Sequence, residues 1–250
     1  MLAKHGEYDQ ELTDSAMMGP NALLLAVELT QSMSLREGMM VLDLGCGKAL
    51  SSVFLAREFG VVVFAVDSQV HASENYLMIK ENGLQDKVFP INGEASALPF
   101  NEHTFDALIC INAFHNFGTG ESFFSEKLVP LLKPGAQFGL AIPCLAKEFY
   151  DQQPSDQKEF FDSCAMPAFI TAEKWRRLVG GSAQVRIDCC REMDCTHAAW
   201  NDWIRVNSPH SLPGDGVQTQ IDPTLPGDGV QTQIDPKIAF VMITGKIEGK

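Results

Sequence analysis

The sequence predicts an α/β protein with a doubly wound, mostly parallel sheet of seven strands, helices on both faces and an antiparallel last strand. Short apolar runs alternate with segments of helical spacing from residue 22 to residue 142, and a glycine-containing turn follows the first run. Strand, helix and next parallel strand form a right-handed unit, so repeated alternation builds a parallel sheet. The 250 residues, 45% of them hydrophobic, suffice to bury one substantial core.

The expected strands are short apolar runs, each closed by a polar or glycine-containing turn. They cover residues 39–44, 61–66, 87–91, 105–111 and 137–142, with two further strands near 183–189 and 237–246. Continuous apolar runs of this length are typical of strands that are buried on both faces of a parallel sheet. The first five strands therefore form the centre of the predicted sheet.

The segments between these strands have the apolar spacing of helices. They cover residues 22–33, 50–57, 70–82, 121–132, 155–163, 171–179 and 196–205. Asn21 can cap the first helix, and Asn82–Gly83 can end the third. Lys133–Pro134–Gly135 is expected to stop the helix at 121–132, because proline cannot continue a helix.

Composition and charge argue against several classes of protein. The chain has 19 Lys and Arg against 32 Asp and Glu, a net charge of −13, and no long basic run. Nucleic-acid binding is disfavoured, because it requires clustered Lys and Arg to neutralise phosphates. No apolar stretch reaches the roughly 18 residues of a membrane span, and residues 1–12 lack the apolar run of a signal peptide. We therefore expect a cytoplasmic protein with a small-molecule partner; its oligomeric state stays open, with a homodimer as one option.

The seven cysteines are odd in number and irregularly spaced, at positions 46, 110, 144, 164, 189, 190 and 195. No Cys-x-x-Cys pair occurs, so we expect no structural metal site. Reduced thiols that pack as small apolar side chains are the simple interpretation. The alternative is a site for a thiophilic metalloid formed by the five cysteines from 144 onwards.

The strongest local signal is VLDLGCGK at residues 41–48, where the first strand meets the next helix. Glycines let the backbone approach a ligand closely, and a helix N-terminus offers free N–H groups. A glycine turn alone is weak evidence, because NAD-dependent enzymes use one and many such turns bind nothing. From Gly45 the chain reads GCGKAL, so Leu50 stands where the NAD motif G-x-G-x-x-G needs its third glycine. The pattern favours an adenosyl cofactor without a pyrophosphate.

Asp67 ends the second strand, 20 residues after Gly47. A carboxylate at this place can accept hydrogen bonds from both hydroxyls of a ribose. The alternatives are a solvated acid at a strand end or a helix N-cap. A second specific signal is GEASALPF at residues 93–100, followed by TFDA at 104–107.

Five motifs in order carry a resemblance to a known family: VLDLGCGKA, FAVD, GEASALPF, FDALICINAFHNFG and LLKPGAQFGLAIP. Over residues 20–145 the sequence resembles the class I, Rossmann-like S-adenosylmethionine-dependent methyltransferases, near the small-molecule group that includes the ubiquinone-biosynthesis C-methyltransferases. The resemblance implies S-adenosyl-L-methionine as cofactor and methyl transfer to a small-molecule acceptor that it does not identify. A catalytically silent protein that kept the cofactor site is the second hypothesis, and an NAD-dependent oxidoreductase is the third.

The resemblance places the cofactor-binding residues at the ends of the predicted strands. They are Asp43, Gly45, Cys46, Gly47, Asp67, Ser68, Glu94, Ala95 and Asn112. The turn after the first strand would surround the methionine and ribose, and Asp67 would hold the ribose hydroxyls. Glu94 and Ala95 would face the adenine, and Asn112 would line the methionine end.

Three positions depart from the family pattern. Ala49 stands where a third glycine is usual, Glu94 replaces the commoner Asp, and Ser68 replaces an apolar residue. None of the three changes abolishes cofactor binding on physical grounds, so the expected site stands.

His115, just past the fourth strand, is the candidate catalytic residue. A general base is needed only when the acceptor must lose a proton, and an ordinary histidine pKa near 6.5 suits that task. The alternative is a histidine that lines the pocket or caps a helix. His197, Trp200 and Trp203 share one predicted helix at i,i+3 spacing, which is more often a core face than a ligand cage.

Residues 212–223 (LPGDGVQTQIDP) recur letter for letter as residues 225–236. Two copies are too few for a solenoid, and their Pro, Gly and Asp content predicts a long surface loop. A lid over the substrate pocket is the alternative, and an acidic Ca²⁺ loop is disfavoured by its spacing.

The whole chain, residues 1–250, is expected to form a single methyltransferase domain. Residues 1–35 would be an N-terminal helical or lid segment and 36–145 the cofactor-binding half. Residues 146–250 would form the substrate-side half, with the duplicated loop at 212–236.

Overall fold

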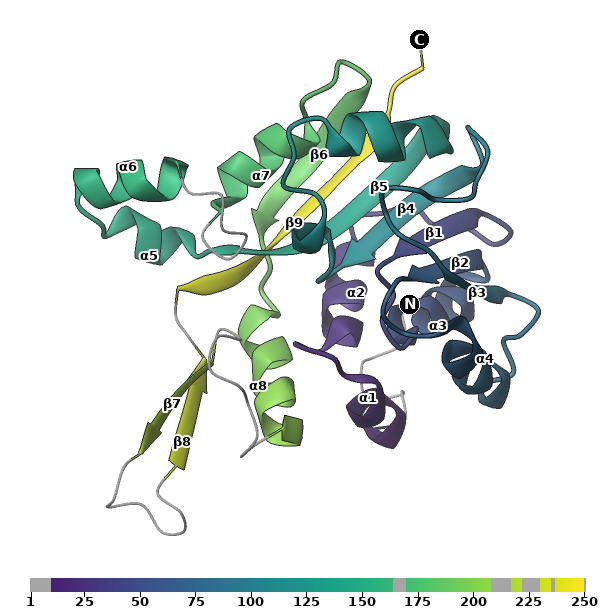
Figure 1. The fold of residues 1–250 in the computed structure, drawn as a ribbon, viewed down its shortest axis with the longest axis horizontal. Helices are drawn as coiled ribbons and strands as arrows, with labels where there is room; N and C mark the ends of the chain where they lie inside the picture. The colour runs from purple at the N-terminus through teal and green to yellow at the C-terminus, as the bar shows by residue number, and fades with distance from the viewer. Residues whose placement is uncertain (1–9, 164–169, 208–216, 222–229, 235–236, 250) are drawn as a thin grey trace.

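The computed structural model describes residues 10–163, 170–207, 217–221, 230–234 and 237–249. Its centre is a seven-stranded sheet with the order β3-β2-β1-β4-β5-β9-β6 (Figure 1). The strands are β1 Met40–Leu44, β2 Val62–Asp67, β3 Val88–Asn92, β4 Phe105–Ile111, β5 Leu132–Leu145, β6 Val185–Glu192 and β9 Ile238–Ile247. The pairs from β3 to β5 are parallel, and β9 lies antiparallel between β5 and β6. The predicted fold class is confirmed, including the antiparallel last strand.

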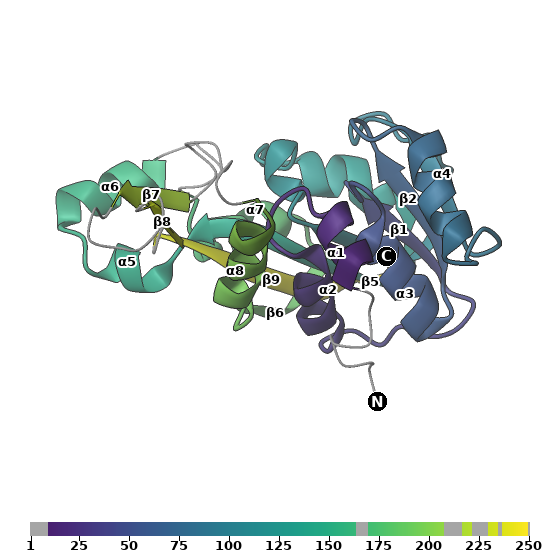
Figure 2. The ribbon, with the colours of Figure 1, turned by 90° about the horizontal axis from the view of Figure 1, so that it is seen from below.

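Eight α-helices accompany the sheet in the described part of the chain. They are α1 Gln10–Ala16, α2 Ala22–Thr30, α3 Leu50–Phe59, α4 Ala72–Glu81, α5 Lys147–Asp151, α6 Ser155–Ser163, α7 Ala172–Val179 and α8 Thr196–Asn207. Asn21 caps α2 as predicted, because its side-chain oxygen accepts hydrogen bonds from the N–H groups of Leu23 and Leu24. Figures 1 and 2 show α2 between α3 and α8, on one face of the sheet.

Two hydrophobic cores lie on the two faces of the sheet. Neighbouring residues of β1 point to opposite sides, so Val41 joins one core and Leu42 the other. The first core packs against α2, α3 and α8, and the second against α7 and the turn that precedes β5. This double burial explains the continuous apolar runs of the parallel strands.

The segment predicted as a helix at 121–132 is helical from Phe124 to Leu131, but it is not a regular α-helix. A π-helical turn covers Phe124–Leu128 and a 3₁₀ turn covers Val129–Leu131. Pro130 lies inside this segment and has no N–H, so regular α-helical hydrogen bonding cannot continue through it. β5 then begins at Leu132, and residues 133–136 bulge from its pairing with β4 before the ladder resumes at Gln137. Lys133–Pro134–Gly135 therefore belongs to β5 and not to a helix end.

The duplicated segment is in part a hairpin and not the expected loop. β7 Val217–Ile221 and β8 Val230–Ile234 are the VQTQI portions of the two copies, and they pair antiparallel. Alternating β-branched residues favour strands, which explains why this portion of each copy is extended. The rest of 212–236 lies outside the described residues.

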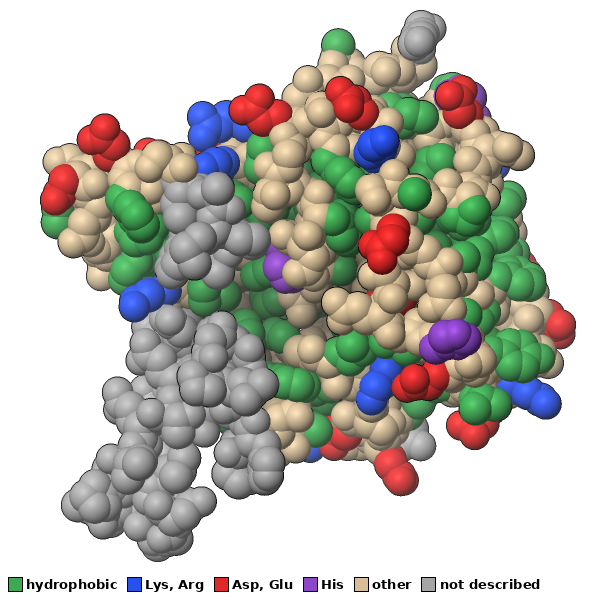
Figure 3. Space-filling model, viewed as in Figure 1, with side chains coloured by type: hydrophobic (Ala, Val, Ile, Leu, Met, Phe, Trp, Pro, Cys, Tyr) green, Lys and Arg blue, Asp and Glu red, His purple; other side chains and the backbone are tan. Residues whose placement is uncertain are grey.

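Among the described residues, no helix combines the length and apolar character needed to cross a bilayer. On the face in Figure 3, Lys and Arg side chains lie apart or in small groups beside Asp and Glu. α5 and α6 project beyond the sheet and contain no buried residue (Figure 1). The core therefore comes from the sheet and the helices packed on it.

A substitution at Gly245 tests the position of β9 in the sheet. A Cβ atom there would overlap the carbonyl oxygen of Arg186 and lie 2.6 Å from a ring atom of Phe138. We expect Gly245→Ala to lower the free energy of unfolding by about 2–3 kcal/mol, because β9 must shift away from β6. Urea titration measures this. Gly249→Ala is the matched control, since its Cβ makes only an ordinary contact at 3.8 Å; equal stability of the two variants would contradict the strand order.

Candidate functional site: a cavity at the ends of three strands

A cavity of about 410 Å³ lies beyond the carboxyl ends of β1, β2 and β4. The chain runs outward from β1 to β3 on one side and returns with β4 on the other, so the cavity lies where the strand order reverses. Ligands of open α/β sheets bind at this place. Its wall consists of residues 16–20, 44–48, 66–69, 93–96 and 111–113, with Ala22, Leu50, Ser51, Asn116 and Phe117.

The turn after β1 is held in a conformation that few side chains tolerate. Gly45, Gly47 and Ala49 all have positive φ angles, of +74°, +53° and +58°. A Cβ on Gly45 would overlap the Cβ of Ala113, so glycine is required for the close approach of β1 and β4. The N–H group of Gly45 donates to the carbonyl oxygen of Val66 at 2.8 Å.

Ala49 adopts the left-handed conformation that the usual third glycine would adopt. Such strain costs an alanine about 1–2 kcal/mol. Ala49 is fully buried, and its left-handed φ shows that the turn accommodates an alanine at this position.

Asp67 fastens this turn to the end of β2. Its Oδ2 accepts a hydrogen bond from the N–H of Gly47 at 2.8 Å, and its Oδ1 accepts from the N–H groups of Gln69 and Val70 at 2.8 and 2.9 Å. Each carboxylate oxygen has two lone pairs, so Oδ2 retains one for a further donor. Asp67 thus caps a local turn and also faces the cavity, while the N-cap of α4 is His71 and not Asp67.

Asp43 lies beneath the turn and does not line the cavity. Its Oδ2 accepts hydrogen bonds from the hydroxyls of Ser51 and Ser52 at 2.7 and 2.6 Å. Its Oδ1 is buried and has no partner among the described residues. Burial raises the pKa of Asp43 to about 6, although the two serine donors oppose this shift.

The other expected cofactor residues line the cavity. They are Gly45, Cys46, Gly47, Ser68, Glu94, Ala95 and Asn112. Burial raises the pKa of the Cys46 thiol, which keeps it uncharged. Glu94 is exposed at the rim, and Asn112 takes a left-handed φ of +51° at the end of β4.

His115 does not line the cavity, although its neighbours Asn116 and Phe117 do. Its Nδ1 is buried without a partner among the described residues, and burial lowers the pKa of His115 to about 4. A base with this pKa accepts protons poorly at neutral pH. The catalytic role of His115 stays a prediction that this geometry does not support.

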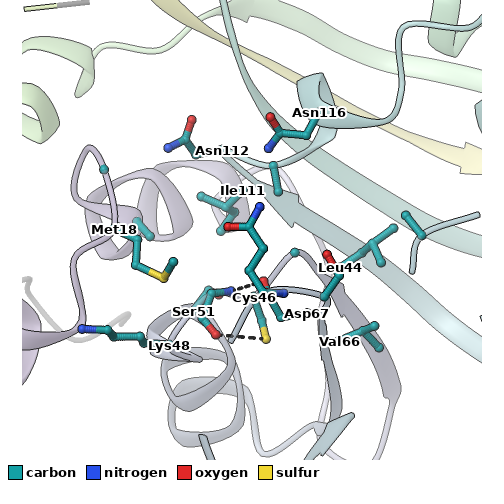
Figure 4. Close-up of a pocket in the computed structure, with 18 of the residues that line it drawn as sticks. Met18, Leu44, Cys46, Lys48, Ser51, Val66, Asp67, Ile111, Asn112 and Asn116 are labelled. Atoms are coloured by element: carbon teal, nitrogen blue, oxygen red, sulfur yellow. Dashed lines mark hydrogen bonds between the residues drawn. The ribbon is translucent and has the colours of Figure 1, made fainter. Parts of the chain in front are cut away.

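Several cavity residues are not among the site residues expected from the sequence, although some lie in the predicted N-terminal helical or lid segment 1–35. The segment 16–20, which we call the strap, contributes Met17, Met18, Gly19 and Pro20 to the wall, and Lys48 and Asn116 lie on other sides (Figure 4). The strap lies more than twenty residues from the glycine turn along the chain, so only the fold brings them together. Tyr8, near the strap in sequence, lies outside the described residues.

The two tryptophans of α8 belong to the first core and not to the cavity. Trp200 is 6% exposed and its ring centre lies 6.4 Å from that of Phe240. Trp203 packs against the same core. The core interpretation of this helix face is therefore confirmed for both tryptophans.

The cysteines give no support to a metalloid site. Cys144 is buried in the second core, and burial raises the pKa of the thiol of Cys190 to about 11. Among the described residues, no three His, Cys, Asp or Glu side chains are grouped to hold a metal ion. Cys164 lies outside the described residues.

Residues 41–135 match the family described as "Methyltransferase domain". Over these residues the chain is similar to a methyltransferase domain, in line with the S-adenosylmethionine-dependent class that its motifs resemble. S-adenosylmethionine is the cofactor of this class, and the match covers the glycine turn, Asp67 and the β4 end that form the cavity.

Similar curated proteins are sterol 24-C-methyltransferases. That of Gibberella zeae, ERG6B, is 28% identical over 131 residues, which are 52% of this chain and 34% of that protein. That of Yarrowia lipolytica is 30% identical over 129 residues, or 50% of this chain and 33% of that protein. The matched part therefore spans about a third of these relatives.

Two solved structures share the fold over most of the chain. The [4+2]-cyclase SpnF has a TM-score of 0.68 and 14% identity, with 96% of this chain and 93% of that one covered. Geranyl diphosphate C-methyltransferase from Streptomyces coelicolor A3(2) has a TM-score of 0.63 and 15% identity, with 91% and 79% covered. The likeness extends the fold assignment beyond residue 135.

Asp43 and His115 oppose each other in the pH dependence of stability. Because the pKa of Asp43 is raised, the fold favours its neutral form. The resulting stabilisation is fully present below about pH 3.8 and is lost as the pH rises through about 6. Because the pKa of His115 is lowered, the fold favours its neutral form. The resulting stabilisation is fully present above about pH 6.5 and is lost as the pH falls through about 4. Between these limits the two effects offset each other.

Single variants should separate the two titrations. We expect Asp43→Asn to gain stability as pH rises from about 4 to about 6.5, relative to the wild type, because only the histidine effect remains. His115→Gln should lose stability over the same interval. The measurement is the urea midpoint of unfolding as a function of pH over this interval. Parallel curves of midpoint against pH for the wild type and both variants would show that neither group is buried as described.

Proposed function

We propose that the protein is an active methyltransferase that transfers the methyl group of S-adenosylmethionine to carbon in a small, largely apolar acceptor. The observation that carries this proposal is the cavity formed by the glycine turn after β1, the Asp67 carboxylate and residues 93–96. Its volume of about 410 Å³ is within the range of cofactor pockets. The relatives named above are C-methyltransferases, which supports carbon as the acceptor atom.

The residues of the cavity fit the cofactor at both ends. At the β2 and β3 ends, the free lone pair of Asp67 Oδ2 suits a ribose hydroxyl, and Glu94 suits the adenine amino group. At the β1 and β4 ends, Gly45 and Gly47 line the cavity with backbone that carries no side chain. These contacts would hold the adenosyl group across the strand ends and direct the methionine part towards Asn112.

When bound, the cofactor supplies a methyl group that is already activated by its sulfonium. The protein therefore has to align an acceptor with this group and exclude water. His115 has a pKa of about 4 and lies off the cavity wall, so the site favours an acceptor that needs no prior deprotonation. Electron-rich carbon is such an acceptor.

An apolar acceptor suits the aromatic wall behind the β4 end. Phe117 lines the cavity, and its ring centre lies 5.6 Å from that of Phe114 and 5.5 Å from that of Phe123. Aromatic rings in edge-on contact support one another and present an apolar surface. Ile111 adds to this surface at the end of β4.

The alternative is a protein that binds the cofactor without methyl transfer. One observation favours it: the fold neighbour with a TM-score of 0.68 is named a [4+2]-cyclase, so this fold also serves another reaction. Incubation with S-adenosylmethionine labelled on the methyl group and a panel of apolar acceptors separates the two. Labelled product supports transfer; tight cofactor binding without product from any acceptor supports the alternative.

Asp67→Ala tests the cofactor site. We expect S-adenosylhomocysteine to bind about tenfold to a hundredfold more weakly, because the variant loses the ribose partner and the acceptor that holds Gly47. Calorimetry measures the affinity, with NAD as a second ligand. Asp86→Ala is the control of equal charge on an exposed turn. Unchanged affinity in Asp67→Ala, or binding of NAD in place of the homocysteine analogue, would overturn the assignment.

A further inference from the structure

Two side-chain amides lie together at the β4 end of the cavity. Asn112 directly follows β4, and Asn116 ends the short 3₁₀ turn Phe114–Asn116. In Figure 4 both amides lie on one side of the cavity, and Cys46, Ser51 and Asp67 lie on the other. Neither amide group has a hydrogen-bond partner among the described residues. Each has a carbonyl acceptor and two N–H donors available to a ligand.

The backbone places Asn112 at a cost. Its φ of +51° is left-handed, a conformation that costs a non-glycine residue about 1–3 kcal/mol and tends to occur at ligand sites. The strap leaves room for the amide, since a Cβ on Gly19 would lie 2.9 Å from its Nδ2. Local structure therefore keeps this amide at the cavity wall.

Charge is absent from this end of the cavity. The acidic residues Asp67 and Glu94 come from the β2 and β3 ends. Lys48 is the one Lys or Arg among the described lining residues, and its Nζ donates to the carbonyl oxygen of Ser15 at 2.9 Å. The described residues offer no group of metal ligands either. A diphosphate would meet a net negative lining in which Lys48, held at the Ser15 carbonyl oxygen, is the single Lys or Arg among the described lining residues.

Building on the proposed function, we propose that Asn112 and Asn116 form a two-amide clamp for a hydroxyl group on an uncharged, otherwise apolar acceptor. A hydroxyl donates one hydrogen bond and accepts others, so one amide oxygen and one amide N–H satisfy it together. The aromatic wall at Phe117 then packs on the apolar skeleton. The clamp fixes the hydroxyl by its proton and by one lone pair and thereby positions the apolar skeleton, so that methyl transfer is directed to carbon.

The test measures binding of defined probes to the full chain in the presence of S-adenosylhomocysteine. The probes are two prenyl alcohols, geraniol and farnesol, their diphosphates, and the hydrocarbons myrcene and farnesene. We expect at least one alcohol to bind more tightly than both its diphosphate and its hydrocarbon. Asn116→Leu should weaken alcohol binding about tenfold and leave hydrocarbon binding unchanged, because it removes one hydrogen-bond partner and no apolar surface.

Two further variants keep the result specific. Asn112→Gly removes the second amide but permits the left-handed backbone, and it should weaken alcohol binding to a similar degree. Asn101→Leu makes the same exchange at an exposed residue outside the cavity and should change nothing.

The outcomes separate the clamp from the proposed function. Failure of the wild type to bind S-adenosylhomocysteine would overturn the proposed function and the clamp with it. Intact binding of that ligand with a preference for diphosphate or hydrocarbon, with no alcohol bound, or with equal alcohol affinity in Asn116→Leu, would overturn the clamp alone. A product methylated on the alcohol oxygen would also contradict it.

Discussion

The hydrogen bond from the Gly47 N–H group to Asp67 Oδ2 is the contact on which the cavity depends. It joins the turn after β1 to the last residue of β2, two strand ends that only the parallel sheet brings together. A charged acceptor makes such a bond stronger than a neutral one, and the same carboxylate fixes residues 68–70 through Oδ1. The floor of the cavity is thus preorganised by one side chain that also faces the ligand space.

Beneath this turn lies a buried carboxyl group that lowers the stability of the folded protein. Asp43 is fully buried, and the hydroxyls of Ser51 and Ser52 at the start of α3 satisfy only one of its oxygens. Burial of an incompletely paired carboxylate costs stability, which is why its pKa rises. The two serines tie the first turn of α3 to β1, so Asp43 shapes the glycine turn from below without contact to the cavity. The direct cofactor contact implied by resemblance stays a prediction for Asp43, which contacts Ser51 and Ser52 and does not line the cavity in this structure.

The sheet could be predicted from sequence because its signals are local. The run VVVFAV becomes β2 with only a one-residue shift, since a strand buried on both faces must be apolar at every position. The conformation of the segment before β5 could not be predicted from the sequence. Pro130 and Pro134 both interrupt a helical pattern, and only packing decides which conformation results. The strap lies in the expected N-terminal helical or lid segment, but no residue pattern places its side chains or Asn116 in the cavity wall. Their place in the wall depends on contacts between residues far apart in the chain, as with Met18, whose sulfur would lie 3.1 Å from a Cβ on Gly47.

The residues that flank the strap contact α8. Arg205 of α8 donates to both carboxylate oxygens of Asp14 in α1, at 2.9 and 2.7 Å, and Asn21 donates to Asp202 of α8 at 2.7 Å. The side chain of Arg205 is 48% exposed, and exposed ion pairs stabilise a protein by only about 0–1 kcal/mol. The ion pair between Arg205 and Asp14 therefore contributes more to the orientation of the two helices than to the free energy of unfolding. Its two parallel hydrogen bonds fix the orientation of α1 on α8, and this orientation places Met17–Pro20 against the glycine turn.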